Sequence, residues 1–76
     1  MMIIKVLGSG CMSCKKLEAN TRKAVEELGI GATIEKVTDF KDIVAYGVMT
    51  TPALVIDEQV KIMGKVASVE EIKKYL

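Results

Sequence analysis

The N-terminal third of the chain constrains the fold more than any other part of the sequence. Residues 2–7 are almost continuously apolar and end at a Gly-Ser-Gly triplet, as expected of a strand buried on both faces of an α/β sheet. From Cys14 onward, the positions at three- and four-residue spacing between charged side chains are Leu17, Thr21, Ala24, Val25 and Leu28. This spacing predicts an amphipathic helix, which Gly29 is suited to end. A strand leading into such a helix begins a β-α-β unit.

The next residues complete that unit and start a second helix. Residues 32–37 predict a second strand, which a right-handed crossover would place parallel to the first. Thr38 or Asp39 then offers a side-chain cap for a helix that Gly47 is expected to stop. The first two strands should therefore lie in one sheet.

The C-terminal third predicts a hairpin and a final helix. Residues 53–56 form an apolar strand, and residues 59–63 return after a turn at Asp57-Glu58. Ser68, followed three residues later by Glu71, is a capping box in front of the last helix. The predicted order is β-α-β-α-β-β-α. We expect one α/β domain over residues 1–76, with a four-stranded mixed sheet and helices on both faces.

Composition argues against several classes of partner. The 76 residues include two tyrosines, one phenylalanine and no tryptophan, too few for the stacking platforms of many single-strand nucleic-acid binders. Eleven basic and ten acidic side chains are interleaved, so neither nucleic acid nor an anionic membrane is expected as a partner. No run approaches the roughly 18 apolar residues of a membrane span, and the apolar N-terminus is too short for a secretory signal. We therefore expect a soluble, cytoplasmic monomer.

Cys11 and Cys14 form a C-x-x-C motif between the first strand and the first helix. At the start of a helix, residues three apart share a face, and their Cα atoms lie within the roughly 4.4–6.8 Å that a disulfide tolerates. Cys14 is in register with the apolar stripe of the helix, so we expect it to be the inner sulfur and Cys11 the solvent-facing one. The pair should close and open with little backbone movement.

The position of the pair also predicts its reactivity. Free N–H groups and the positive end of the helix dipole favour a thiolate, which lowers the pKa of a thiol from its usual value of about 8.5. Lys15 follows Cys11 by four residues and either stabilises that thiolate or is a solvated surface lysine. We expect Cys11 to attack disulfides and Cys14 to resolve the resulting mixed disulfide.

Other chemistries for the pair are limited, because the chain has no histidine. A Cys–His hydrolase would need one, and a structural zinc site needs four ligands, which only a dimer could assemble. The main alternative is a carrier of a soft metal, Cu(I) or zinc, with thioether help from Met12 and Met49. Heavy-metal-associated domains, however, run β-α-β-β-α-β. The second alternative is a non-catalytic module that binds extended peptides.

The segment Gly10-Cys11-Met12-Ser13-Cys14, its flanking strand and helix, and Thr51-Pro52 ahead of an apolar strand together resemble the thioredoxin superfamily. More closely, the chain resembles the small redox-active disulfide protein 2 group, glutaredoxin-sized proteins of archaea and bacteria. The resemblance covers essentially the whole chain and includes residues 47–53 and Gly64. It implies a minimal thioredoxin-like fold. It also implies a disulfide oxidoreductase without any cofactor other than its own Cys11–Cys14 disulfide, and without a metal.

The same resemblance implies roles for residues outside the motif. Pro52 would be a cis-proline facing the disulfide, and Thr51 would offer its backbone to an extended substrate. The alternative is a trans Pro52 that starts an edge strand. The residues that would line the substrate groove are Met12, Val48, Met49 and Gly64. For these, core packing or loop punctuation is the alternative.

The chain departs from its larger relatives at several positions, including Met12-Ser13, where thioredoxins usually have Gly-Pro. The tryptophan before the cysteine pair is replaced by Gly10, and Lys5 stands near the place of a buried acid. Lys5 either tunes Cys14 or carries its ammonium to the sheet edge. Gly64 is not followed by the acidic pair that binds glutathione in glutaredoxins, so glutathione is not expected. The resemblance implies protein disulfide substrates and a flavin-dependent thioredoxin reductase-like partner.

Overall fold

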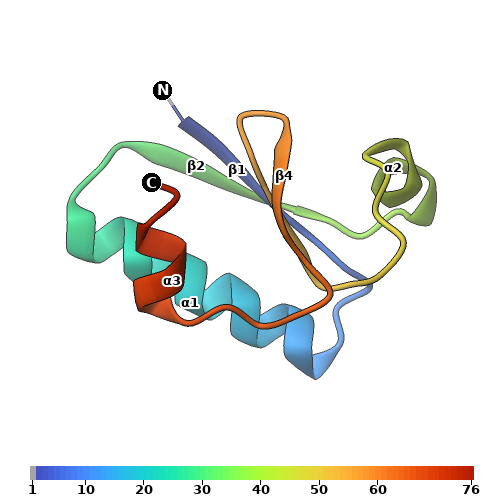
Figure 1. Ribbon diagram of the computed structural model, residues 1–76, viewed down its shortest axis with the longest axis horizontal. Helices are drawn as coiled ribbons and strands as arrows, with labels where there is room; N and C mark the ends of the chain where they lie inside the picture. Colours follow the sequence, from blue (N-terminus) through green and yellow to red (C-terminus); the bar gives the residue numbers. More distant parts are fainter. Residues whose placement is uncertain (1) are drawn as a thin grey trace.

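The computed structural model describes residues 2–76 (Figure 1). The elements are β1 (Met2–Leu7), α1 (Met12–Leu28), β2 (Ala32–Val37), α2 (Phe40–Ala45), β3 (Ala53–Ile56), β4 (Gln59–Met63) and α3 (Val69–Lys73). The described helices include none that is long and apolar enough to span a membrane. The predicted order of elements is confirmed. Met1, the first residue of the expected domain, lies outside the described residues, and the single-domain assignment stays a prediction.

The four strands form one mixed sheet in the order β2-β1-β3-β4. β1 pairs with β2 in parallel, as a crossover through α1 requires, and with β3 antiparallel. β4 extends the sheet antiparallel to β3. α1 and α3 lie together on one side of the sheet, and α2 lies on the other (Figure 1). The predicted α/β fold, with helices on both faces of a four-stranded mixed sheet, is confirmed.

Alternation of side chains along the central strands divides the interior into two cores. Ile4 and Val6 of β1 belong to the larger core, which also contains residues of α1 and α3. Leu7 belongs to a smaller core with Ile43 of α2. β3 is divided in the same way, and its four residues are all buried because both of its faces are covered. The strand that leads to the cysteines is therefore held from both sides.

The helices begin and end close to the capping residues that the sequence predicted. Gly29 adopts a left-handed conformation with a φ of 63°, which ends α1. The Asp39 side chain caps α2, and Ser68 Oγ accepts a hydrogen bond from the Glu71 N–H at 3.1 Å at the start of α3. The carboxylate of Glu71 was expected to complete a capping box, but it pairs with Lys65 at 2.5 Å. The cap on α3 therefore comes from Ser68.

Two apolar positions predicted to be buried are exposed. Leu28 is 42% exposed, because the contacts of α1 with the larger core end at Val25. Ile3 is 39% exposed, so β1 is not buried on both faces along its whole length. The short helix α2 packs against the Leu7 end of β1 and leaves the Ile3 end of that face open.

Candidate active site

The two thiols lie at the N-terminus of α1 in different environments. Cys11 is the N-cap residue, is exposed, and its Sγ accepts a hydrogen bond from the Cys14 N–H at 3.3 Å. Cys14 lies in the first turn and is only 6% exposed. Neither thiol is joined in a disulfide in this structure. The predicted division into an outer and an inner sulfur is confirmed.

Their pKa values shift in opposite directions. Hydrogen bonds from the Cys14 thiol and then from the Cys14 N–H lower the pKa of Cys11 below its ordinary value. Burial, and then the hydrogen bond to Cys11, raise the pKa of Cys14. Of the two sulfurs, the exposed one therefore ionises more readily and the buried one keeps its proton longer as the pH rises.

This difference predicts the pH dependence of alkylation. A lowered pKa means a larger thiolate fraction at a given pH, so Cys11 should reach half its maximal rate with iodoacetamide at a lower pH than an ordinary cysteine. Cys14 should require a higher pH than Cys11, because its pKa is raised and its sulfur is buried. Mass spectrometry of the alkylated peptides over a pH series measures both rates. Equal midpoints for the two residues would contradict the assignment.

Gly8 allows the Cys14 sulfur to approach the backbone. A Cβ atom on Gly8 would lie 2.2 Å from Cys14 Sγ and 3.1 Å from Cys14 Cβ. The same position would lie 3.9 Å from Thr51 Cβ, so Thr51 and Cys14 flank Gly8. In the sequence, Gly8 stands out only as the end of the first strand. The sequence signal for its close contact with the cysteine pair is its position, three residues before Cys11.

The segment that ends at Pro52 packs beside Gly8, the residue that the Cys14 sulfur also approaches. The Thr51–Pro52 peptide bond is cis, as the resemblance implied, and Pro52 is buried while Thr51 is exposed. The Gly64 N–H donates to the Pro52 carbonyl at 2.8 Å. A Cβ on Gly64 would lie 2.7 Å from Thr50 Oγ1, so Gly64 also packs closely against this segment. Residues far apart in the sequence therefore meet at one end of the sheet.

The other groove candidates differ in exposure. Met12 is 72% exposed and Met49 is 87% exposed, so core packing does not explain either of them. Val48 is 2% exposed and belongs to the smaller core, so its assignment to the groove was wrong. Burial beside Leu7 makes Val48 an anchor of the loop. The two methionines remain available to a bound partner.

Lys15 lies beside the buried sulfur. It lines a hollow of about 40 Å³ together with Cys14 and with the ion pair between Glu18 and Lys36, whose charged atoms are 3.2 Å apart. The largest causes of the lowered Cys11 pKa are contacts with Cys14, and Lys15 is not among them. Its role in tuning the thiol stays a prediction.

Lys5 does not act on Cys14. Its Nζ donates to the Tyr46 hydroxyl at 2.6 Å and to Glu58 at 2.9 Å, on the α2 side of the sheet. These two partners hold the pKa of the Lys5 ammonium above its usual value. Cys14 lies on α1, which covers the opposite face. The hypothesis that Lys5 tunes Cys14 was therefore wrong, and the cost of a lysine in an apolar strand is offset by polar partners.

A C-x-x-C dithiol at the start of the helix of a β-α-β unit is the arrangement of thioredoxin-like redox motifs. Residues 2–76 match the family model for the thioredoxin domain, and the chain belongs to this family. It is 50% identical to the thioredoxin of Methanothermobacter thermautotrophicus over 76 residues, which are all of this chain and 99% of that protein. It is 46% identical to the thioredoxin of Methanocaldococcus jannaschii, covering all of this chain and 87% of that protein. The protein is a thioredoxin-like disulfide oxidoreductase.

The fold does not support the soft-metal alternative. The described elements run β-α-β-α-β-β-α, whereas heavy-metal-associated domains run β-α-β-β-α-β. Among residues 2–76, no group of three or more Cys, His, Asp or Glu side chains is placed to hold a metal ion. The element order thus separates the two classes that share a C-x-x-C after the first strand.

Proposed function

We propose that the protein exchanges electrons with protein disulfides through a Cys11/Cys14 dithiol–disulfide couple. The observation that carries the proposal is the contrast between an exposed sulfur with a lowered pKa and a buried sulfur with a raised one. A thiolate, not a thiol, is the nucleophile in disulfide exchange. Cys11 is therefore the attacking residue and Cys14 the resolving residue.

The exchange takes two steps. The Cys11 thiolate attacks one sulfur of the substrate disulfide, which forms a mixed disulfide and releases the other sulfur as a thiolate that takes up a proton. Cys14 then loses its proton and attacks Cys11 Sγ, which forms the Cys11–Cys14 disulfide and releases the second substrate thiol. The substrate gains two electrons and the protein loses two. The contact between Cys11 Sγ and the Cys14 N–H keeps the two residues close for the second step.

Residues around the pair form the substrate site in this proposal. Thr51 is exposed next to Gly8 and offers its backbone to an extended substrate, while Pro52 closes the site on that side. Met12 and Met49 present exposed apolar side chains, and flexible methionines adapt to different partners. Gly64 allows the β4–α3 loop to approach the same segment.

The partners follow from the chemistry. The oxidised protein needs an external two-electron donor, for which a thioredoxin reductase-like flavoprotein is our choice, and needs no cofactor besides its own disulfide. The two cysteines of the sequence both belong to the C-x-x-C motif, so none is left for a structural disulfide. This usage of cysteine suits a reducing compartment such as the cytoplasm. We propose that the protein acts there as a monomer.

The proposal is tested by trapping substrates with a Cys14→Ser variant. Without the resolving thiol, Cys11 should remain joined to its substrates as mixed disulfides. Mass spectrometry of adducts from a cell lysate, before and after reduction with dithiothreitol, identifies the trapped proteins.

The matched control is the double variant Cys11→Ser/Cys14→Ser, which should trap nothing. Adducts that persist in the double variant, or a Cys14→Ser variant without adducts, would contradict the assigned roles. One copper ion per chain on the purified wild-type protein would restore the soft-metal alternative.

A further inference from the structure

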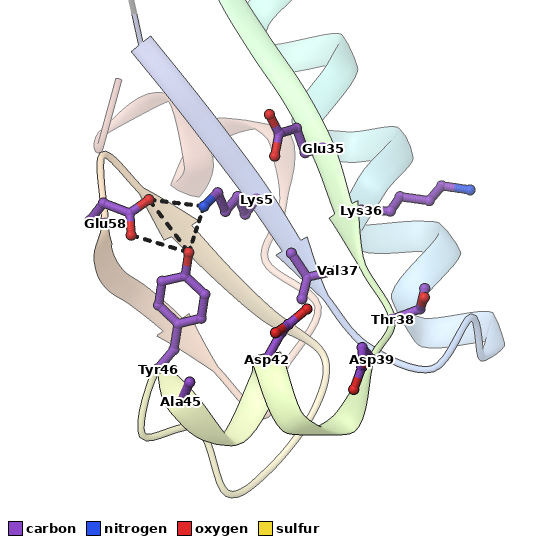
Figure 2. Close-up of a pocket in the computed structure, with 10 residues that line it drawn as sticks. All are labelled: Lys5, Glu35, Lys36, Val37, Thr38, Asp39, Asp42, Ala45, Tyr46 and Glu58. Carbon is purple, nitrogen blue, oxygen red and sulfur yellow. Dashed lines mark hydrogen bonds and ion pairs between the residues drawn. The ribbon is translucent and has the colours of Figure 1, made fainter.

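Three polar side chains from separate elements meet on the α2 side of the sheet (Figure 2). Lys5 comes from β1, Tyr46 from the C-terminal end of α2, and Glu58 from the β3–β4 turn. They line one end of a hollow of about 700 Å³, and neither cysteine lines it. We call these three residues the Lys5 cluster.

The Lys5 cluster is a closed set of hydrogen bonds. The Lys5 ammonium donates to the Tyr46 hydroxyl at 2.6 Å and to Glu58 Oε1 at 2.9 Å. The Tyr46 hydroxyl donates to Glu58 Oε2 at 3.2 Å. The ammonium also lies 5.3 Å from the centroid of the Tyr46 ring. The Tyr46 hydroxyl thus has both a donor and an acceptor, which restrain its side chain from two directions.

Tyr46 directly precedes the segment that ends at Pro52. It is the C-cap residue of α2, and residues 47–52, here called the Pro52 loop, follow it. Within this loop, Val48 is anchored in the smaller core and Pro52 accepts a hydrogen bond from Gly64. Met49, Thr50 and Thr51 lie between these anchors and are exposed. The Lys5 cluster therefore adds a polar anchor immediately before Val48, at the N-terminal end of the Pro52 loop.

The cluster and the thiols lie on opposite sides of the sheet. Lys5 shares the α2 side with Leu7, whereas Cys14 belongs to α1 on the other side. Any effect of the cluster on the thiols has to pass through the backbone. The Pro52 loop provides such a path, because Thr51 lies beside Gly8 and Gly8 contacts Cys14 Sγ.

We propose that the Lys5 cluster positions the Pro52 loop for binding extended disulfide substrates, and that Lys5, Tyr46 and Glu58 are positioning residues for this step. The inference rests on the proposed function of the cysteine pair. A loop held at both ends presents the Thr51 backbone in one conformation, so less conformational entropy is lost when a substrate strand binds. Small disulfides that reach only Cys11 do not need this preorganisation.

The test compares two substrates with a Tyr46→Phe variant, which keeps the ring and removes the hydroxyl. One substrate is an extended peptide that carries a cysteine as a mixed disulfide with thionitrobenzoate, and the other is hydroxyethyl disulfide. The KM for the peptide should rise about two- to tenfold, the range expected from the loss of one or two hydrogen bonds. Its kcat and the rate with hydroxyethyl disulfide should change by less than about twofold. Amide hydrogen exchange of residues 48–51 should become faster.

Tyr75→Phe is the matched control, because Tyr75 follows α3 on the opposite side of the sheet and is 42% exposed. It should leave both KM and loop exchange unchanged. Glu58→Gln keeps an acceptor for Lys5 and should raise the KM less than Tyr46→Phe. An unchanged KM in Tyr46→Phe, or equal losses on both substrates, would overturn the inference. Failure of the proposed function is distinct, since the wild-type protein would then reduce neither substrate.

Discussion

Replacing Cys11 with serine should lower disulfide reduction by about a thousandfold or more, as expected when an essential nucleophile is removed. A serine hydroxyl does not ionise at neutral pH, so no anion is available to attack the substrate sulfur. Insulin reduction with dithiothreitol as the electron donor measures the loss. Activity within about tenfold of wild type would contradict a role for Cys11 as nucleophile.

The Cys11→Ser protein should remain folded, which makes the loss of activity interpretable. Cys11 is the N-cap of α1, where its Sγ accepts the Cys14 N–H. Serine is among the preferred N-cap residues and accepts the same hydrogen bond through its hydroxyl oxygen. The change in Tm should stay within about 4 °C, as for other mild surface changes in a domain of this size. Circular dichroism during heating provides this control.

Replacing Gly8 with alanine should lower the stability of the fold and slow the resolution of mixed disulfides by Cys14. The added Cβ would lie 2.2 Å from Cys14 Sγ, a distance that forces the sulfur or the backbone to move. Overpacking of this kind costs about 1–3 kcal/mol, which lowers the Tm of a small domain by roughly 5–20 °C. A displaced Cys14 sulfur should also attack Cys11 more slowly, so mixed disulfides should live longer. Thermal unfolding and rapid quenching of the mixed disulfide measure the two effects.

Gly31→Ala is the matched control for Gly8→Ala. A Cβ on Gly31 would have no neighbour within 4 Å, and its backbone is not in the left-handed region. Gly31→Ala should therefore change the Tm little and leave the rate at which Cys14 resolves mixed disulfides unaffected. Equal behaviour of the two variants would show that the contact between Gly8 and Cys14 does not constrain the site.

The order of the elements and the chemical motif could be predicted because both depend on local patterns. The predicted bounds of the first two strands, residues 2–7 and 32–37, coincide with β1 and β2. Apolar periodicity and the caps at Gly29, Asp39 and Ser68 act within a few residues of the chain. The C-x-x-C spacing at a helix start likewise placed Cys11 outside and Cys14 inside before any long-range contact was known.

The errors concern residues whose environment depends on distant parts of the chain. Leu28 fits the helical stripe but extends beyond the core contacts of α1. Val48 stands in the loop before Pro52 and was placed in the groove, yet it packs against Leu7. The partner of Lys5 could not be inferred, because Tyr46 follows it by 41 residues and only the antiparallel return of β3 brings Glu58 near.

By itself, the sequence determined the alternation of strands and helices and the position of the dithiol at a helix N-terminus. It also determined which of the two sulfurs is exposed and which is buried. All three depend on periodicity, capping and helix spacing, which operate over a few neighbouring residues. Only the tertiary structure decided that Gly8 has no room for a side chain, that Gly64 packs against the segment before Pro52, and that Lys5 is held by Tyr46. These are contacts between separate elements. They exist only once the sheet has brought those elements together.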